Sequence, residues 1–437
     1  MDDAPSNSPE AGTAAVDSGR RARGPRRLFY GWWIVGAGLS GQTVHAALYT
    51  LGAAALFLPV AREFGTSRTI IAGVLAAAQL EGGLTGPIEG FLIHWIGPRR
   101  YMIVGWVVFG AGLIAIGLSQ NVLQFYAAFL LTALGQSMAG FLPVVTTLMN
   151  WFLKKRGRAI AIFQMGTSLG ALLVPAYAWS ILNVGWRPTT IAAGIAAIVV
   201  GVPLALTIRN RPEDHGLLPD GAPAQAPTAT VTGGRPQDAP RGDGTGTTVA
   251  QVLRSRSFWF LGTAHAASLL TWGALRIHQI PALVDLGIDE QMAANVFSLT
   301  LTVAAAGRLL GGFLGDFLGV RRVLFFAILS QSVAMVLLAF ASTVVHALAI
   351  AVIFGIAFGA RGTLLTVLRG EVFGRKNFSR LAGLMDPLTT IGSVTAPLFA
   401  AYAFDTQGTY TGAFLILAAV GGFGAILLYG IRMPARA

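Results

Sequence analysis

The 437-residue sequence contains no cysteine and few charged side chains. The missing cysteine excludes disulfides, thiol catalysis and Cys-ligated metal sites. Only 11% of the residues are Asp, Glu, Lys or Arg, against about a quarter in soluble proteins. The sequence also lacks a phosphate-binding Gly-Lys-Ser/Thr loop, a His-x3-His metal pair and a nucleophile elbow. We therefore expect no enzyme activity, no cofactor, no metal and no ATP drive.

Long apolar runs take the place of charge. Hydrophobic residues make up 54% of the chain, and many runs exceed the roughly 18 residues that indicate a membrane-spanning helix. The sequence predicts an all-α membrane protein with twelve transmembrane helices. Their expected ranges are 31–59, 70–96, 101–119, 123–150, 158–180, 187–208, 257–284, 290–315, 321–341, 345–372, 380–403 and 410–432.

The net charge of +12 is unevenly distributed. Lys and Arg gather at the two ends and in alternate connections, whereas acids such as Asp285, Asp289 and Asp405 lie in the others. This is the positive-inside pattern, and it predicts that both termini are cytoplasmic. No basic stripe with interleaved aromatic residues stands out, so we expect the lipid bilayer as partner and no nucleic acid.

Two stretches, 222 positions apart, share a pattern of glycines and paired arginines. GFLIHWIGPRR begins at Gly90, and GFLGDFLGVRR begins at Gly312. Other residues keep the same offset, including Pro59 with Pro281. The sequence therefore predicts two parallel six-helix repeats, an arrangement in which transporters place their binding site at the repeat interface near mid-membrane.

The repeats divide the chain into two bundles and three connecting or terminal segments. We expect a cytoplasmic tail without regular structure over 1–28, a first bundle over 29–209 and a second over 256–432. Residues 210–255, rich in Pro, Gly, Ala and Thr, predict a flexible cytoplasmic linker, and 433–437 a short cytoplasmic tail.

The second stretch matches a motif of the form G-x3-D-x2-G-x-R-R through Gly312, Asp316, Gly319, Arg321 and Arg322. With this motif in both halves, the chain resembles the major facilitator superfamily. The resemblance implies that an acid of the motif pairs with an arginine of the other half when the cytoplasmic side is closed.

The resemblance assigns gating roles to five residues. Asp316 is expected to contact Arg158, and position 94 to face Arg380. His94 stands where the family has Asp, which makes the second contact weak or pH-sensitive unless His94 is only an interfacial polar residue. Glu89 lies close to the same gate.

Three further stretches narrow the resemblance to one branch of the superfamily. FYGWWIV at 29–35, NWFLKKRGRAIAI at 150–162 and GIAFGARG at 355–362 are similar to bacterial relatives of monocarboxylate transporters and oxalate:formate antiporters. The resemblance implies small organic anions, often carboxylates moved with a proton. Arg308 matches the arginine that holds the substrate carboxylate in monocarboxylate transporters, although Ala304 and Ile391 depart from the relatives' patterns.

Ionisable residues inside predicted membrane helices are the other candidates, because they are costly there. For substrate binding we name, besides Arg308, the residues Arg361, His278, Tyr49 and His45; each has the alternative of a packing or ion-pair role.

Two carboxyl groups are the candidates for proton coupling. Glu81 lies near mid-depth of its predicted helix and Asp386 about two turns into another. A buried carboxyl group is able to take up and release a proton during a transport cycle. A static polar contact is the alternative for each.

The leading hypothesis is a monomeric secondary transporter that moves a small organic anion, most simply a monocarboxylate with a proton, by rocker-switch alternating access. A proton-driven exporter of drugs or metabolites and a non-transporting membrane receptor are the alternatives. The excess of Arg over Lys and the many Ala and Gly residues favour a bacterial inner membrane.

Overall fold

The computed structural model describes residues 29–66, 68–221 and 249–432. The N-terminal bundle begins with α1 (Tyr30–His45), a π-helical segment (Ala46–Thr50) and α2 (Ala53–Glu63). It continues with α3 (Arg68–Ile96), α4 (Pro98–Leu118), α5 (Val122–Ala139), α6 (Phe141–Trp151), α7 (Arg156–Asn183) and α8 (Trp186–Thr207). Two short 3₁₀ turns, Glu213–His215 and Pro219–Gly221, follow it.

The C-terminal bundle follows the short helix α9 (Val249–Leu253). Its helices are α10 (Arg256–Asp285), α11 (Glu290–Leu318), α12 (Val320–Ala339), α13 (Val344–Gln407) and α14 (Thr411–Leu427), with a final 3₁₀ turn at Leu428–Gly430. Gly374, with φ of 70°, divides α13 into two helices. Each of the twelve predicted helices has its counterpart, so the all-α prediction is confirmed.

The backbone repeats as the sequence does. Gly97 and Gly319, 222 positions apart, both have positive φ, 86° and 90°, and both precede the next helix. Gly65 and Gly287, at the same offset, also have positive φ. Positive φ strains any residue with a Cβ, so glycine is needed at each of these four turns. The two halves are therefore parallel structural repeats.

Two predicted helices are interrupted. The first one passes through the π-helical segment and breaks at Gly52, where an added Cβ would lie 2.0 Å from the Ala47 carbonyl oxygen. The fourth one breaks between α5 and α6 at Gly140, which has φ of −93° and ψ of −124°. The predicted continuous spans over 31–59 and 123–150 are each two helices with a bend.

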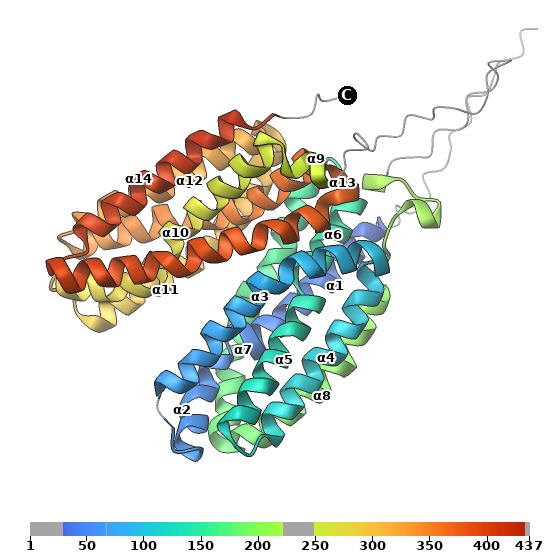
Figure 1. Cartoon of the computed structure of the whole chain (residues 1–437), viewed down its shortest axis with the longest axis horizontal. Helices are drawn as coiled ribbons and strands as arrows, with labels where there is room; N and C mark the ends of the chain where they lie inside the picture. Colours follow the sequence, from blue (N-terminus) through green and yellow to red (C-terminus); the bar gives the residue numbers. More distant parts are fainter. Residues whose placement is uncertain (1–28, 67, 222–248, 433–437) are drawn as a thin grey trace, which may run out of the picture.

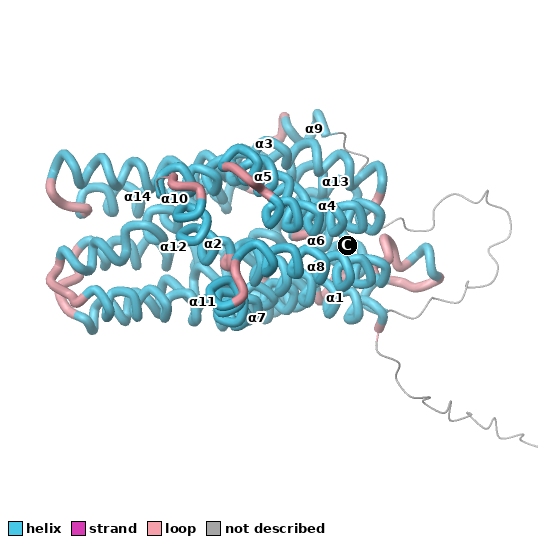
Figure 2. Tube along the Cα trace, turned by 90° about the horizontal axis from the view of Figure 1, so that it is seen from below, coloured by secondary structure: helices cyan, strands magenta, loops and turns pink. Residues whose placement is uncertain are grey.

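The two bundles meet at one end and diverge toward the other (Figure 1). Phe29 and Arg432, the ends of the described chain, lie at the meeting end, which we call the terminal end; the opposite end is the far end (Figure 2). One buried apolar cluster joins both bundles at the terminal end. The far half of the C-terminal bundle has a separate core of its own.

Glycines let the two bundles approach at the terminal end. An added Cβ on Gly157 of α7 would lie 2.5 Å from the Gly312 carbonyl oxygen of α11, and one on Gly312 would lie 2.6 Å from the Gly157 oxygen. On the opposite side, an added Cβ on Gly90 of α3 would lie 2.4 Å from the Ser379 oxygen of α13. Ser379 and Gly90 are the repeat equivalents of Gly157 and Gly312, so the two crossings are copies of each other.

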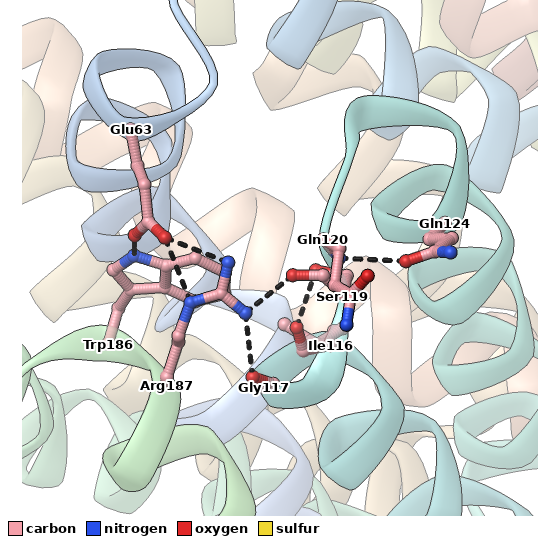
Figure 3. A network of polar contacts seen from close by, with 8 residues as sticks. All are labelled: Glu63, Ile116, Gly117, Ser119, Gln120, Gln124, Trp186 and Arg187. Atoms are coloured by element: carbon pink, nitrogen blue, oxygen red, sulfur yellow. Dashed lines mark hydrogen bonds and ion pairs between the residues drawn. The ribbon is translucent and has the colours of Figure 1, made fainter.

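A polar network ties together the far end of the N-terminal bundle (Figure 3). Glu63, at the end of α2, accepts hydrogen bonds from the Trp186 indole and the Arg187 guanidinium at the start of α8. Arg187 also donates to the carbonyl oxygens of Gly117 and Ser119, where α4 ends. This network fixes three helix ends to one another.

Eight helical stretches in the described part of the chain are long and apolar enough to cross a membrane. The first predicted span, α3, α10 and the second half of α13 are not among them. These helices carry ionisable residues such as Glu81 and Asp386, which are half-buried, and Arg276, which lines a pocket. The chain is a multi-pass membrane protein, and its more polar helices contact other protein helices rather than only lipid.

Three of the predicted segments fall partly or wholly outside the described residues. These are the tail over 1–28, the central part of the linker (222–248) and the tail over 433–437.

We expect a larger side chain at the α7–α11 crossing to open the terminal end. Gly312→Val would place carbon atoms where the Gly157 oxygen lies, and such overpacking costs about 1–3 kcal/mol. Because the sequence lacks cysteine, spin labels attach only to cysteines introduced at the exposed positions Lys155 and Arg322. Double electron–electron resonance should report a longer distance between the two labels in Gly312→Val.

The matched variant is Gly422→Val, in which an added Cβ meets no atom within 4 Å. It should show the same distance between the labels as the parent. Equal distances in the two variants would contradict the role of the α7–α11 contact.

Candidate functional site

An ion pair joins the bundles beside the Gly157–Gly312 contact. Arg158 Nε lies 3.2 Å from Asp316 Oδ2, and Asp316 Oδ1 accepts a hydrogen bond from the Gly157 backbone N–H at 3.3 Å. The Arg158 guanidinium also lies over the Phe313 ring, 5.0 Å from its centroid. The predicted contact between Asp316 and Arg158 is therefore present, and its role as a gate stays a prediction.

The second crossing keeps the aromatic contact of the first. Arg380, the repeat equivalent of Arg158, lies over the ring of Phe91 at 5.3 Å, and Phe91 is the equivalent of Phe313. His94, which replaces the motif acid, is half-buried at the end of α3. The guanidinium–aromatic contact is thus common to both crossings, whereas the carboxylate of the motif, Asp316, is present only at the first.

Glu89 is buried within the N-terminal bundle next to the second crossing, with 3% of its surface exposed. Its Oε2 accepts a hydrogen bond from Ser137 at 2.8 Å and its Oε1 one from Thr85 at 3.3 Å. Two hydroxyl donors therefore hold this carboxyl group in place, one turn from Gly86, where α3 meets α13.

Asp386 enters the same crossing from α13. An added Cβ on Gly86 would lie 2.7 Å from Asp386 Oδ2, so the carboxyl group reaches the backbone of α3. Arg369, 6% exposed, interacts electrostatically with Asp386, and its Nη2 contacts the Nδ1 of His265 on α10. Sequence reasoning did not single out Arg369 or His265, although an arginine inside an apolar run is itself a signal.

Arg308 points from the C-terminal bundle toward the N-terminal bundle. It lies on α11, one turn before Gly312, and is half-buried. Its Nη1 donates a hydrogen bond to Ser168 Oγ on α7 at 3.0 Å. No acid within the described ranges is paired with it, so its charge is held by a neutral hydroxyl. Such a guanidinium presents further N–H donors to an anion.

Arg361 points within its own bundle. It is 4% exposed, donates from Nη1 to Ser268 Oγ on α10 at 2.9 Å and lies over the Phe358 ring at 5.0 Å. Its Nε has no hydrogen-bond partner in the described part of the chain. Arg308 and Arg361 therefore stand on neighbouring helices but face different neighbours.

Glu81 and Tyr49 lie near one another in the N-terminal bundle. Tyr49 sits in the π-helical segment, against the rings of Phe109 and Phe129, and interacts electrostatically with Glu81 of α3. Glu81 is half-buried, and its Oε2 has no hydrogen-bond donor among the described residues. A buried carboxylate oxygen without a donor costs free energy that uptake of a proton removes.

The two candidate histidines are packed between other side chains. His45 is fully buried and stacks on Trp106, with ring centroids 4.1 Å apart. His278, near the far end, has its Nε2 2.9 Å from the Pro397 carbonyl oxygen and its Nδ1 3.3 Å from the Tyr410 hydroxyl. The structure thus brings neither ring to Arg308. In the described part of the chain, no group of His, Asp and Glu has the arrangement of a metal site.

Comparisons with known proteins agree with this architecture. The model of the Major Facilitator Superfamily matches residues 38–279 and 268–437. Monocarboxylate transporter 12-B of Danio rerio is 23% identical over 406 residues, 88% of this chain and 84% of that protein. Monocarboxylate transporter 7 of Homo sapiens is 22% identical over 425 residues, 85% and 80% of the two chains. The structure of FucP in the outward conformation superimposes with a TM-score of 0.70 at 16% identity, covering 92% of this chain and 99% of FucP.

We expect the Arg158–Asp316 pair to stabilise the closed terminal end. Asp316→Asn removes the charge but keeps an oxygen that accepts a hydrogen bond from Gly157. Any loss of stability of the closed terminal end therefore reports the ion pair alone. Exposed pairs contribute up to about 1 kcal/mol and buried ones more. The spin-labelled protein described above should therefore show at least a several-fold larger open population.

The matched variant is Asp285→Asn, which removes an exposed acid at the far end and should leave the distances unchanged. Exchanging the two charges, in Arg158→Asp with Asp316→Arg, should restore part of the closed population. If Asp316→Asn stays as closed as the parent, the ion pair does not hold this end.

Proposed function

The chain belongs to the Major Facilitator Superfamily, and we propose that it is a secondary transporter of a small monocarboxylate, moved together with a proton. The named relatives are monocarboxylate transporters, and this supports the substrate class. The two bundles touch at one end and diverge at the other, and this supports transport by rocking of the bundles about the site between them.

Arg308 is the observation that carries the proposal. It is a guanidinium inside the membrane-spanning part, aimed from one bundle at the other, with only the neutral Ser168 hydroxyl as side-chain partner among the described residues. A carboxylate between the bundles would meet the remaining N–H donors and compensate the buried charge. Arg361, one helix away, adds positive potential to the same region and is the second proposed substrate residue.

Tyr49, His45 and His278 have weaker support as substrate residues. Tyr49 lies next to Glu81, where its hydroxyl is able either to hydrogen-bond to the substrate or to take part in proton transfer. The packing of the two histidine rings requires a rearrangement before either contacts a ligand.

Two carboxyl groups supply the proposed proton route. Glu81 has a buried oxygen without a donor, and Asp386 lies at the crossing of α3 with α13, where it faces Gly86 and interacts with Arg369. Protonation of either group lowers the cost of moving it through an apolar interface. Asp386 is placed to couple its charge to the separation of the two bundles.

The gate is proposed to work through the first crossing. Asp316 and Arg158 would separate when the terminal end opens, while Arg380, His94 and Glu89 respond at the second crossing. We propose that the protein is a monomer in the inner membrane of a bacterium. The terminal end is proposed to face the cytoplasm, because the basic connections gather at that end.

Arg308 should be required for transport of carboxylates. In proteoliposomes with an inward proton gradient, the parent protein should accumulate one or more acids from a labelled monocarboxylate panel. Arg308→Ala should lower the rate by at least about tenfold, because a charge-assisted hydrogen bond contributes about 1.5–3 kcal/mol. Arg254→Ala, which removes an exposed arginine directly after α9, is the matched control. Uptake that is absent in the parent, or indifferent to Arg308, would refute the proposal.

Glu81 should be required for coupling rather than for exchange. Glu81→Gln keeps the size and polarity of the side chain but cannot release a proton. We expect the variant to exchange labelled for unlabelled substrate across the membrane, yet to lose accumulation driven by the proton gradient. Asp386→Asn is examined in the same way. Gradient-driven accumulation that persists in both variants would remove both carboxyl groups from the proton route.

A further inference from the structure

A pocket that Arg308 does not line lies between the two bundles. Its volume is about 180 Å³, and its walls come from α3, α10 and α13. It begins beyond the contact of Gly83 with Thr390, where an added Cβ on the glycine would lie 2.5 Å from the threonine hydroxyl. Its main lining residues are Gln79, Trp272, Arg276, Thr389, Thr390 and Ser393.

The hydrogen-bond donors of this pocket are unused. Arg276 and Gln79 are exposed within the pocket, and neither they nor the Thr390 hydroxyl has a protein hydrogen-bond or ion-pair partner in the ranges that the structure describes. Thr389 and Ser393, by contrast, donate their hydroxyl protons to backbone carbonyl groups. The pocket therefore offers one cation and two neutral donors, the set that a carboxylate requires.

One wall of the pocket is aromatic. The Trp272 indole stacks on Phe358 on one side, with ring centroids 4.0 Å apart and planes at 20°, while the residue also lines the pocket. The Phe358 ring behind it is in turn covered by the Arg361 guanidinium at 5.0 Å. The indole is thus held rigidly, and a rigid aromatic wall favours a flat apolar group.

The size of the pocket limits the ligand. A cavity of about 150 Å³ holds one benzene molecule, and this pocket measures about 180 Å³. It therefore has room for a single ring with a carboxylate directed at Arg276.

We propose that this pocket binds a monocarboxylate that bears one aromatic ring, with Arg276 on the carboxylate and Trp272 against the ring. The site goes beyond the proposed function, because it does not include Arg308. Since Gln79 comes from the N-terminal bundle and the other residues from the C-terminal one, a bound ligand bridges the bundles and favours the arrangement seen here.

The test is a binding measurement on the full chain in phosphatidylcholine nanodiscs, with the substitution Arg308→Gln so that a carboxylate at Arg308 does not contribute. Isothermal titration with benzoate and with acetate should show benzoate binding about two- to twelvefold tighter, because one aromatic contact contributes about 0.5–1.5 kcal/mol. Loss of all benzoate binding on Arg308→Gln would place the ligand at Arg308 and overturn the assignment.

Two further substitutions separate the roles of the two residues. Arg276→Gln should weaken benzoate and acetate alike by at least about tenfold, and Arg276→Lys should restore part of the affinity. Trp272→Leu should weaken benzoate about fivefold and leave acetate unchanged. The matched controls are Arg256→Gln at the start of α10 and Trp95→Leu on α3, both at exposed positions, and neither should affect binding.

A lipid phosphate is the competing anion for Arg276, and glycerol 3-phosphate serves as its soluble mimic. We expect it not to displace benzoate. Displacement of benzoate by glycerol 3-phosphate at similar concentrations, or equal losses in Arg276→Gln and Arg256→Gln, would overturn the proposal. Unchanged melting temperatures of the variants establish that a loss of affinity is not a loss of folding.

Discussion

The structure depends on close backbone contact between the two bundles at the terminal end. Gly157 against Gly312, and Gly90 against Ser379, bring helices of different bundles together at two crossings. Side chains of ordinary size would keep these helices apart, and Asp316 would no longer reach Arg158, nor Asp386 the backbone of α3. The contacts that Asp316 and Asp386 make across the bundles therefore depend on a few missing Cβ atoms.

The ionisable groups between the bundles have different kinds of partner. Glu89 is buried and Glu81 half-buried in the N-terminal bundle, and Asp386 of the C-terminal bundle interacts with Arg369. The C-terminal bundle supplies arginines that are held largely by neutral groups, Arg308 by Ser168 and Arg361 by Ser268. A neutral hydroxyl satisfies a donor without cancelling the charge, so the C-terminal bundle keeps a positive potential in the region between the bundles. An anion that enters this region completes the compensation.

The parts of the fold that depend on local sequence were predictable. The 222-residue offset predicted two equivalent halves, and the positive φ of both Gly97 and Gly319 follows from it. The contact of Asp316 with Arg158 was predicted from the motif. The interruption at Ala46–Thr50 was not, because the stretch before it contains no proline and the segment itself reads AALYT, which does not predict a break. The contact of Arg369 with His265 joins residues 104 positions apart, and only the packing of α10 on α13 determines it.

The unequal chemistry of the two crossings determines how the molecule is able to move. At the α3–α13 crossing, Gly83, Gly86 and Gly90 form a row that lies against Thr390, Asp386 and the Ser379 backbone, so the two helices approach closely along this row. At the α7–α11 crossing, a single ion pair accompanies one glycine pair. If the α3–α13 crossing acts as a hinge and the α7–α11 crossing as a latch, opening is a rotation about one side of the protein, and the entrance widens first beside α7 and α11.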